Sequence, residues 1–325
     1  MLTWLLACLT PTWLTIVASK QTVPLNYTTA VNLIVDLGQS GSRIKIGDQV
    51  TNLLIAKTSS EAITFTVERI FREIKPQVFE KVFLSLTGLQ GEVGNPQPYG
   101  ELCRKFFQSQ EVCVMDDGIA SYVGALGEKD GVALTLGGGV VAIASINGRF
   151  SHADGKGPIF GDFGGGFWIG QNAMQKAIAS LDGRDKNYPL VELLAEEIER
   201  YNSLDNKTGV EAAQLCIAAA KTVAYGAEQS NESALAILDS GASYLAKTIN
   251  AAWIKVNNDN NRIPNVAIQG GLSKSQVYVS NICSHLKNLM NFQYVEAIGD
   301  HLVGAPLVAT KYPSDIAPLM KWWRA

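Results

Sequence analysis

The sequence predicts an α/β protein of two lobes with a duplicated core, and three observations support this prediction. The chain has 325 residues, whereas single domains cluster at roughly 100 to 200 residues. A strand–glycine turn–strand pattern begins at Val31 and recurs from Val132, as in a duplicated architecture. Residues 171–256 carry apolar side chains at helical spacing. Strands and helices therefore share the chain, and two lobes leave room for a cleft.

The first lobe is expected over residues 31–118. Its first strand is a short apolar, β-branched run, a glycine turn follows, and the next strand alternates polar and apolar side chains as a half-buried strand does. Later in this lobe one segment has helical spacing, and two further short runs are apolar. The expected elements are strands over 31–37, 42–47, 81–88 and 112–115 and a helix over 61–74.

The second lobe is expected over residues 119–325, with a helical insertion over residues 171–256. It opens with a second hairpin, and within the insertion apolar residues step by three and four to form one stripe that faces a core. We expect the last helices to pack back on the first lobe. The stripe consists of Leu235, Leu238, Ala242, Leu245, Ile249 and Ala252, and the other expected elements are strands over 132–136, 140–148 and 265–269 and helices over 272–290 and 303–311.

Residues 1–30 are expected to be an N-terminal extension. Residues 1–19 are apolar and end in small residues, as a signal peptide does. However, no Lys or Arg precedes Lys20, and Pro11 interrupts the run, so the segment fits neither a signal peptide nor a membrane span well. We therefore expect a loosely attached extension on a cytoplasmic protein that has no membrane partner.

Composition and charge argue against several classes of function. Hydrophobic residues make up 47% of the chain and charged residues 18%, a balance typical of packed globular domains and not of disorder. The formal net charge is -3 and no basic run stands out, which argues against a nucleic-acid partner. The five cysteines are scattered and form no C-x-x-C pair, so neither a disulfide framework nor a zinc site is indicated.

The glycine-rich turns do not match the two common nucleotide-binding motifs. The turn after residue 37 lacks G-x-G-x-x-G and leads into a strand, and Ser273 stands where a Walker A motif needs glycine. A glycine turn between antiparallel strands can still present backbone N–H groups to a phosphate, because no Cβ blocks the approach. Two facing hairpins can therefore grip a triphosphate, although each hairpin alone is simply a turn.

Three motifs stand in a fixed order along the chain: Asp36, Gly38, Ser40 and Arg43, which fit D-x-G-x-[ST]-x-x-R; then Gly137, Gly138 and Gly139; then Gly270 and Gly271. In this order they resemble the two phosphate motifs and the adenosine motif of the sugar kinase/actin/Hsp70 superfamily. Residues 155–170 are similar to a segment of N-acetylglucosamine kinases and of the wider BadF/BadG/BcrA/BcrD-type ATPase family. The resemblance covers residues 31–311 and implies a two-lobed actin-like ATPase fold, which is ribonuclease H-like.

The resemblance implies ATP and Mg²⁺ as cofactors and a sugar as the small-molecule substrate. Asp36 would organise Mg²⁺ through water, and Asp117, which follows a strand, would be the base that accepts the proton of a sugar hydroxyl. The glycine turns would bind the nucleotide from both lobes. The residues implied in nucleotide binding are Asp36, Gly38, Ser40, Gly137, Gly138, Gly139, Gly270 and Gly271, and those implied in sugar binding are Gly155, Lys156, Gly157 and Asp162.

The acids of this expected site also have a plain structural interpretation. Asp116 and Asp117 precede a helical pattern, where an Asp caps the free N–H groups of the helix start. One acid suffices for a cap, so we expect Asp117, at the carboxyl end of a strand, to be free for chemistry. Asp162 fits a turn in a glycine loop nearly as well as it fits a sugar site.

The chain departs from the family pattern at several positions. Residues 136–140 read L-G-G-G-V where the family has S-G-T-G-S, Phe163 replaces an acid, and Lys156 replaces a tryptophan.

We expect a phosphotransferase that phosphorylates an amino sugar or hexose with ATP, with N-acetylglucosamine and glucosamine as the first candidates. Two rivals stay open. One is an activator-type ATPase of the same family, disfavoured because residues 155–170 hold no cysteine for an iron–sulfur cluster, and the other is a non-catalytic sugar sensor or degenerate kinase. The oligomeric state is left open between a monomer and a homodimer.

Overall fold

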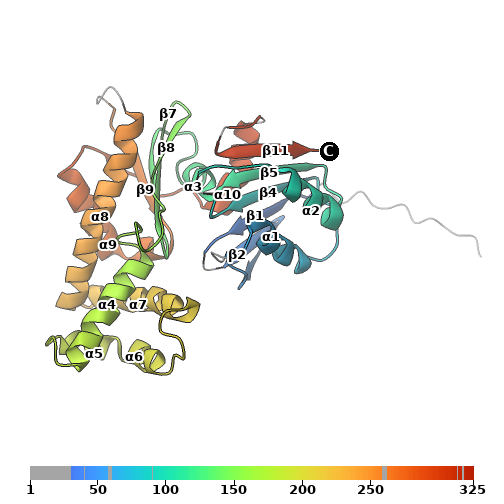
Figure 1. Ribbon diagram of the computed structural model, residues 1–325. Helices are drawn as coiled ribbons and strands as arrows, with labels where there is room; N and C mark the ends of the chain where they lie inside the picture. Colours follow the sequence, from blue (N-terminus) through green and yellow to red (C-terminus); the bar gives the residue numbers. More distant parts are fainter. Residues whose placement is uncertain are drawn as a thin grey trace, which may run out of the picture. The chain divides into compact units, whose positions relative to one another are not determined.

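The computed structural model describes residues 31–39, 41–57, 61–89, 91–257, 262–312, 314–316 and 318–325 (Figure 1). The predicted extension over residues 1–30 and the predicted phosphate ligand Ser40 lie outside the described residues. Two β-sheets, each packed against helices, confirm the predicted α/β class. Both sheets belong to one compact unit, Val31–Ala325, and the lobe boundary at residue 118 stays a prediction.

The first sheet consists of β1 (Leu33–Leu37), β2 (Ser42–Ile46), β3 (Gln49–Leu53), β4 (Lys81–Leu86), β5 (Glu111–Asp116) and β11 (Met320–Arg324). Its strand order is β11-β5-β4-β1-β2-β3. β1, β4 and β5 are parallel neighbours, and β2 closes the first hairpin antiparallel to β1. β1 is buried along its whole length, because a central parallel strand is covered on both faces.

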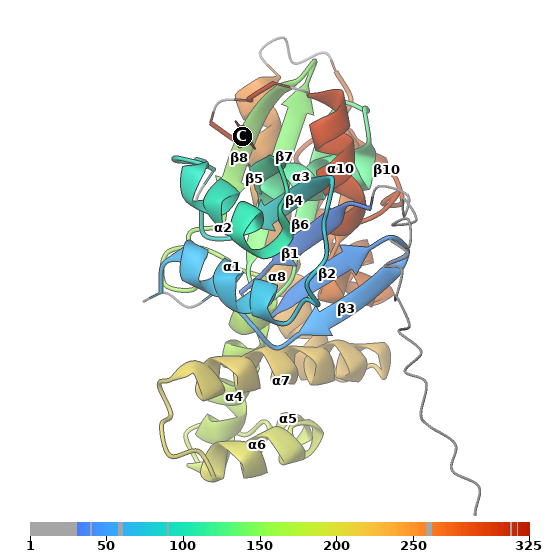
Figure 2. The ribbon, with the colours of Figure 1, turned by 90° about the vertical axis from the view of Figure 1, so that its right-hand side faces the viewer.

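Four helices cover the first sheet: α1 (Ile63–Arg72), α2 (Gln97–Phe107), α3 (Asp117–Leu126) and α10 (His301–Lys311) (Figure 2). α1 and α2 share a core with Leu33 and Val35 on one face. α3 and α10 share another core with Ile34 on the opposite face. Successive side chains of β1 therefore serve two cores, as the alternation of a strand requires.

The second sheet has the order β10-β9-β6-β7-β8, formed by β6 (Gly131–Leu136), β7 (Val140–Ile146), β8 (Arg149–Asp154), β9 (Asn265–Gln269) and β10 (Gln293–Tyr294). Six helices accompany it: α4 (Gly166–Leu181), α5 (Tyr188–Leu193), α6 (Ala195–Asn202), α7 (Val210–Glu228), α8 (Glu232–Val256) and α9 (Gln276–Lys287). The predicted apolar stripe lies on α8, where Leu238, Ala242, Leu245, Ile249 and Ala252 are buried in the core and Leu235 packs beside it. α8 thus covers one face of this sheet.

Some elements differ from those predicted. The helix expected over 272–290 is divided into a 3-10 turn, Gly271–Lys274, and α9. The division falls at Ser275, whose hydroxyl accepts a hydrogen bond from the N–H of Tyr278 and caps α9. Strands β3, β8, β10 and β11 and helix α2 were not among the predicted elements. The helical part of the insertion begins at Gly166, before the predicted residue 171.

The end of the chain returns to the first sheet. β11 pairs antiparallel with β5, the strand that leads to Asp117. Trp323 of β11 is buried over Gly100 of α2, where a Cβ would lie 2.0 Å from the indole ring. Residues 320–324, which the sequence places in the second lobe, therefore support the edge of the first sheet.

Helices α3 and α10 cross with their backbones in contact. A Cβ built on Gly304 of α10 would lie 1.8 Å from the carbonyl oxygen of Ala120, and one on Gly124 of α3 would lie 2.2 Å from that of Asp300. Neither position has room for a side chain. The crossing fixes the start of α10 beside the helix that begins at Asp117.

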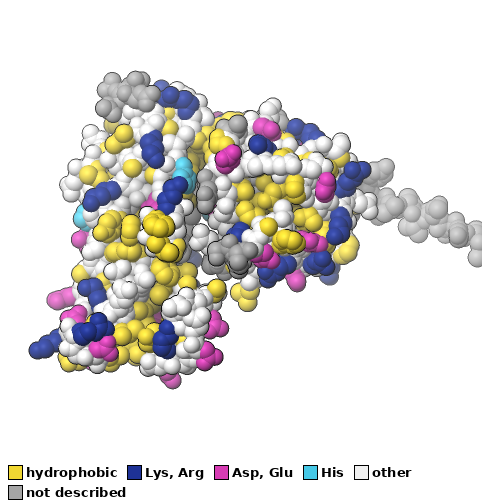
Figure 3. Space-filling view, in the orientation of Figure 1, with side chains coloured by type: hydrophobic (Ala, Val, Ile, Leu, Met, Phe, Trp, Pro, Cys, Tyr) yellow, Lys and Arg dark blue, Asp and Glu magenta, His cyan; other side chains and the backbone are white. Residues whose placement is uncertain are grey.

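The outer surface is mixed in character. On the face shown in Figure 3, Lys and Arg side chains are interspersed with Asp and Glu over both sheets' lobes, in keeping with a net charge of -3. Among the described residues, none of the helices has both the length and the apolar character that a bilayer crossing needs.

Candidate active site

The predicted acids lie at the carboxyl ends of parallel strands of the first sheet. Asp36 is the last residue but one of β1, Ser85 and Thr87 stand at the end of β4, and Asp117 follows β5. The carboxyl ends of such strands form the edge where open α/β sheets bind ligands. Strand order therefore brings together polar side chains from three separate segments.

Asp116 is the cap of α3. One carboxylate oxygen accepts a hydrogen bond from the N–H of Gly118 at 2.9 Å, and the other accepts one from the N–H of Gly91 at 2.9 Å. The N–H of Asp116 donates to the carbonyl oxygen of Leu319. Both oxygens of Asp116 are thus engaged in holding the backbone.

Asp117 is the first residue of α3 and has a different environment. Burial, and after it the negative charges of Asp116 and Asp36, raise the pKa of Asp117 to about 7, although hydrogen bonds from the Thr87 hydroxyl and the Gly118 N–H oppose the rise. A carboxylate with this pKa can both accept and release a proton near neutral pH. Asp117 is therefore chemically suited to general base catalysis.

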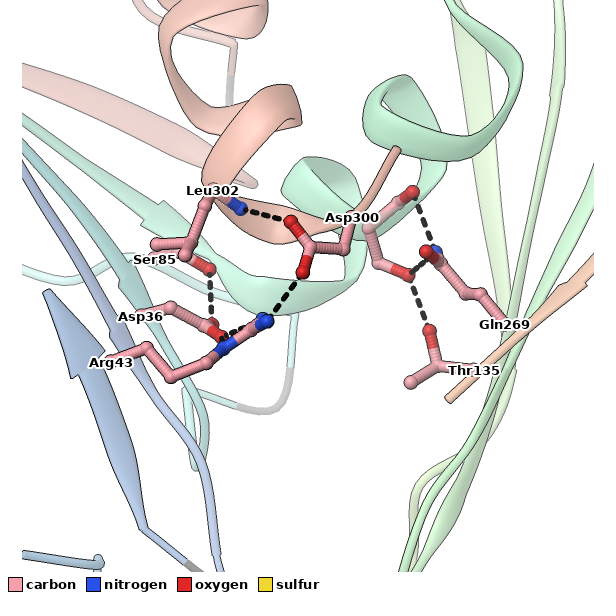
Figure 4. A network of polar contacts seen from close by, with 8 residues as sticks. Asp36, Arg43, Ser85, Thr135, Gln269, Asp300 and Leu302 are labelled. Carbon is pink, nitrogen blue, oxygen red and sulfur yellow. Dashed lines mark hydrogen bonds and ion pairs between the residues drawn. The ribbon is translucent and has the colours of Figure 1, made fainter. Parts of the chain in front are cut away.

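The first hairpin holds Asp36 opposite Arg43. The two residues are register partners on β1 and β2, and the Arg43 guanidinium donates from Nε at 3.0 Å and from Nη2 at 2.6 Å to one oxygen of Asp36. The other oxygen accepts the Ser85 hydroxyl at 3.3 Å (Figure 4). The turn itself is closed by a hydrogen bond from the N–H of Gly38 to the carbonyl of Gly41.

Arg43 also reaches Asp300, the cap of α10. Its Nη1 forms an ion pair with one oxygen of Asp300, whose other oxygen accepts the N–H of Leu302 at 3.0 Å (Figure 4). Burial alone would raise the pKa of Asp300, but the hydrogen bond and charge of Arg43 hold that pKa below its ordinary value. A single guanidinium thus connects the first hairpin to the start of the last helix.

The second glycine turn rests on the start of α4. The carbonyl of Gly137 accepts the N–H of Gly166 at 2.8 Å, and that of Gly138 accepts the N–H of Phe167 at 2.9 Å. The N–H of Gly137 donates to the carbonyl of Gly139 at 3.0 Å. The backbone of this turn is therefore fixed without the hydroxyl side chains of the family pattern.

Asp162 is placed against the same turn. Its carboxylate accepts the N–H of Val140 at 3.2 Å, and a Cβ on Gly139 would lie 2.7 Å from it. Its own N–H donates to Asp154 at 2.8 Å. Burial raises the pKa of Asp162, and the bond from Val140 opposes that rise. This buried carboxylate joins the predicted sugar loop to the predicted phosphate turn.

The other predicted sugar-site residues are less enclosed. Gly155 and Lys156 are exposed and Gly157 is half-buried. Ile159 and Phe160 of the same loop are 78% and 83% exposed, which is unusual for large apolar side chains and marks a surface available to a ligand or to another part of the protein.

The predicted adenosine motif follows β9. Gly270 has a φ of +112°, and a Cβ there would lie 2.3 Å from the carbonyl oxygen of Leu136, at the end of β6. Just before it, the side-chain amide of Gln269 donates to the Ser121 carbonyl at 2.8 Å and also contacts its hydroxyl, which contacts Thr135 (Figure 4). This network joins α3 to the second sheet beside both glycine motifs.

The residues present can hold one divalent cation together with phosphate. Within the described ranges, no group of three or more His, Cys, Asp and Glu is placed as a metal cage. Mg²⁺ is commonly bound through one or two carboxylates, waters and substrate phosphates, and Asp36 and Asp117, at the same edge of the first sheet, are carboxylates of this kind. The donor set therefore fits a cation that arrives with a nucleotide.

A cavity of about 470 Å³ lies beside the start of α3. Gly91, whose N–H binds Asp116, forms part of its wall, as do His152 of β8 and the segment before β11. Small-molecule pockets typically have volumes of roughly 300 to 1,000 Å³. The lining residues are Gly91, Ile143, Gly148, Arg149, Phe150, Ser151, His152, Ile316, Pro318 and Leu319.

The sequence interpretation gave no role to several residues of this site. Arg43 belongs to the first motif and Thr87 lies near the end of a predicted strand, so the proximity of both residues to the acids could have been proposed. Asp300 is 257 residues from Arg43 in the sequence, and no local pattern indicates that contact. Ser85 is a buried polar residue in an apolar strand, which is a usable signal for a functional position.

Residues 28–309 match the family model described as the BadF/BadG/BcrA/BcrD ATPase family. The sequence matches none of the curated proteins with which it was compared.

Solved structures support the fold. A candidate N-acetylglucosamine kinase from Chromobacterium violaceum is 23% identical with a TM-score of 0.62, over 86% of this chain and 99% of that chain. A candidate N-acetylglucosamine kinase from Porphyromonas gingivalis has a TM-score of 0.61 at 12% identity, over 85% and 98%. A ROK family glucokinase from Streptomyces griseus, in complex with glucose and AMPPNP, has a TM-score of 0.55 at 14% identity, over 87% and 99%. These similarities confirm the predicted two-lobed actin-like fold.

Proposed function

The chain belongs to the BadF/BadG/BcrA/BcrD ATPase family, and from this premise we propose that it is an ATP-dependent kinase of an amino sugar or hexose. N-acetylglucosamine and glucosamine are the first candidates. The observation that carries the proposal is the placement of Asp36 and Asp117 at the carboxyl ends of β1 and β5, on either side of β4, with the pKa of Asp117 raised to about 7. One acid is thereby suited to hold a metal–nucleotide, and the other to take a proton.

The proposed reaction uses each group once. Asp117 accepts the proton of a sugar hydroxyl while the oxygen of that hydroxyl forms a bond to the γ-phosphorus of ATP. The bond between the γ-phosphorus and the bridging oxygen of the β-phosphate breaks, and ADP leaves. Asp36 would hold Mg²⁺ through water, and the cation would neutralise phosphate charge. The glycine turns after β1 and β6 would place backbone N–H groups on the phosphates. In this scheme Gly270 and Gly271 contact the adenosine.

The altered second turn is compatible with this chemistry. Leu136 and Val140 lack the hydroxyls of the family pattern, but the turn between them is ordered by backbone hydrogen bonds from Gly166 and Phe167. Backbone N–H groups bind phosphate without side-chain hydroxyls. A non-catalytic sugar sensor remains the second candidate, favoured by the missing hydroxyls.

The cysteines disfavour the activator-type ATPase. Cys103 and Cys113 are buried in the first lobe, and residues 155–170 hold no cysteine. Iron–sulfur clusters require thiolates. For the kinase proposed here, a cytoplasmic location would give access to ATP.

A sugar panel tests the proposal. The purified protein is incubated with ATP, Mg²⁺ and one sugar at a time, while ADP release is followed by a coupled assay and the product by mass spectrometry. A phosphorylated amino sugar or hexose is the expected result. Tight sugar binding without any phosphorylated product would support the sensor and contradict the kinase.

A further inference from the structure

Both carboxylate oxygens of Asp36 are occupied by groups of the chain itself. Arg43 donates twice to one oxygen, at 3.0 and 2.6 Å, and Ser85 donates to the other at 3.3 Å. Asp36 is only 8% exposed. A carboxylate that binds Mg²⁺ through water must accept hydrogen bonds from the metal-bound waters. The arrangement in the structure therefore competes with the metal role of Asp36.

Charge makes this competition unfavourable for simultaneous binding. The guanidinium of Arg43 places a full positive charge beside the Asp36 carboxylate. That charge would repel a divalent cation a few ångströms away, most strongly where water is excluded. Arg43 fills both acceptor sites of one Asp36 oxygen, which leaves a metal-bound water only the oxygen that Ser85 holds at 3.3 Å. A metal-bound water that uses the first oxygen requires Arg43 to release it.

Asp300 provides a second partner for the displaced guanidinium. It already pairs with Nη1 of Arg43, so release of Nε and Nη2 from Asp36 leaves Arg43 paired with a carboxylate. A half-buried arginine without such a partner would carry a large desolvation cost. Asp300 is itself fixed, because it caps α10 through the N–H of Leu302.

We propose that Arg43 is the resident counter-ion of Asp36 and transfers to Asp300 when a divalent cation binds with the nucleotide. Arg43 is then a positioning residue that sets the metal affinity of the site. This inference rests on the proposed function for the identity of the metal–nucleotide. It does not depend on which sugar is phosphorylated.

The test measures metal affinity directly. Mn²⁺ replaces Mg²⁺, and free Mn²⁺ is counted by electron paramagnetic resonance in the presence of saturating non-hydrolysable ATP analogue. Arg43→Gln removes the competing cation and is expected to tighten Mn²⁺ binding about tenfold. The matched control is Arg69→Gln on α1, which removes an exposed arginine paired with Glu61 at 3.2 Å and should leave Mn²⁺ affinity unchanged.

Asp300→Asn distinguishes transfer from simple charge repulsion. Asn also caps helices well, so α10 should persist while the displaced Arg43 loses its partner. Mn²⁺ binding should weaken about threefold or more in the parent background and should not change in the Arg43→Gln background. If Asp300→Asn changes the Mn²⁺ affinity equally in both backgrounds, the transfer of Arg43 is overturned. If Mn²⁺ binds Arg43→Gln no more tightly than the parent, the whole inference is overturned.

Two further measurements keep the outcomes separate. Calorimetric titration of the parent with ATP analogue and Mg²⁺ tests the proposed function alone. If no binding is seen, Mn²⁺ titration without nucleotide decides the inference by the same ordering of variants. If Arg43→Gln does not fold, as judged by circular dichroism, Arg43→Lys replaces it. Lysine keeps the charge but cannot donate in the same forked geometry, and a smaller tightening is then expected.

Discussion

The hydroxyl of Thr87 donates a hydrogen bond to the carboxylate of Asp117, and this contact joins the end of β4 to the first turn of α3. It favours the ionised carboxylate, whereas burial and the charges of Asp116 and Asp36 favour the protonated one. Asp117 is thus balanced between two protonation states. The first predictions concern this balance.

Asp117→Asn should remove the proposed base without removing the helix. Asp116 already caps α3, and Asn is tolerated in a first turn, so the fold and ATP affinity should be kept. The kcat for the sugar should fall by about 10² to 10⁴-fold, because an amide cannot accept the proton. Steady-state kinetics on a variant with native circular dichroism checks this, and a parent-like kcat would leave the mechanism without its base.

Asp116→Asn should behave differently, because both oxygens of Asp116 accept backbone N–H groups. The new amide would turn a donor toward one of them, most simply the N–H of Gly91. We expect a loss of about 1 to 3 kcal/mol in unfolding free energy. Denaturant unfolding measures this, and a stability equal to the parent would show that the bond to Gly91 is unimportant.

Asp117 should also make stability depend on pH. Its pKa is raised to about 7 in the folded protein and lies near 3.9 in an unfolded chain, so the folded state binds the extra proton between these values. The contribution of Asp117 to the free energy of unfolding is fully present below about pH 4 and is lost as the pH rises through about 7. Asp117→Asn should therefore raise the Tm relative to the parent at pH 8 and much less at pH 5. An equal Tm difference at both pH values would contradict the assignment.

Thr87→Val should shift the pH dependence of the rate. Without the hydroxyl, ionised Asp117 loses a donor and its pKa rises further above its ordinary value, so the acid limb of the kcat/KM profile should move to higher pH. The matched control is Thr66→Val, which removes a buried hydroxyl bonded to Glu61 at 3.2 Å outside the site. A profile that moves equally in both variants would indicate a general effect of lost hydroxyls.

The sequence was sufficient for the elements with strong apolar patterns. β1, β4 and β9 are continuous runs of buried apolar residues, and the apolar stripe on α8 has helical spacing. The three strands and this helix can therefore be predicted from the pattern of apolar residues. β3, in contrast, is exposed at four of its five residues and has no apolar face to reveal it. β11 is a strand because β5 offers an unpaired edge, a tertiary cause that five residues cannot encode locally.

The site was predictable only in part for the same reason. Short loops place Asp36 and Asp117 at strand ends, so their neighbourhood follows from the order of parallel strands. The partners that tune them come from elsewhere: Arg43 through hairpin register, and Asp300 through the crossing of α10 over α3. Contacts of this kind depend on packing, which local sequence patterns do not specify.

Gly38→Val should abolish ATP binding if the first turn holds phosphate. A branched side chain there would occupy the space beside the backbone N–H groups. A Cβ on Gly38 would lie 3.2 Å from the Gly41 carbonyl oxygen, and one on Gly138 would lie 2.9 Å from the Ile217 side chain of α7, so native circular dichroism is required before either variant is interpreted. Gly94→Val is the matched control, since nothing lies within 4 Å of its Cβ. Calorimetry with ATP and Mg²⁺ decides, and parent-like affinity in a folded Gly38→Val would refute the phosphate role.

Gly304→Ala should destabilise the protein through the crossing of α3 and α10. The added Cβ would lie 1.8 Å from the Ala120 carbonyl oxygen, so the helices must separate, at a cost of about 1 to 3 kcal/mol or more. Because α3 begins at Asp117, the shift should also reduce kcat. Leu307→Ala, at a 45% exposed position of the same helix, is the control and should change stability by less than about 1 kcal/mol. Equal denaturant midpoints for the two variants would show that the helices can part freely, contrary to their backbone contact.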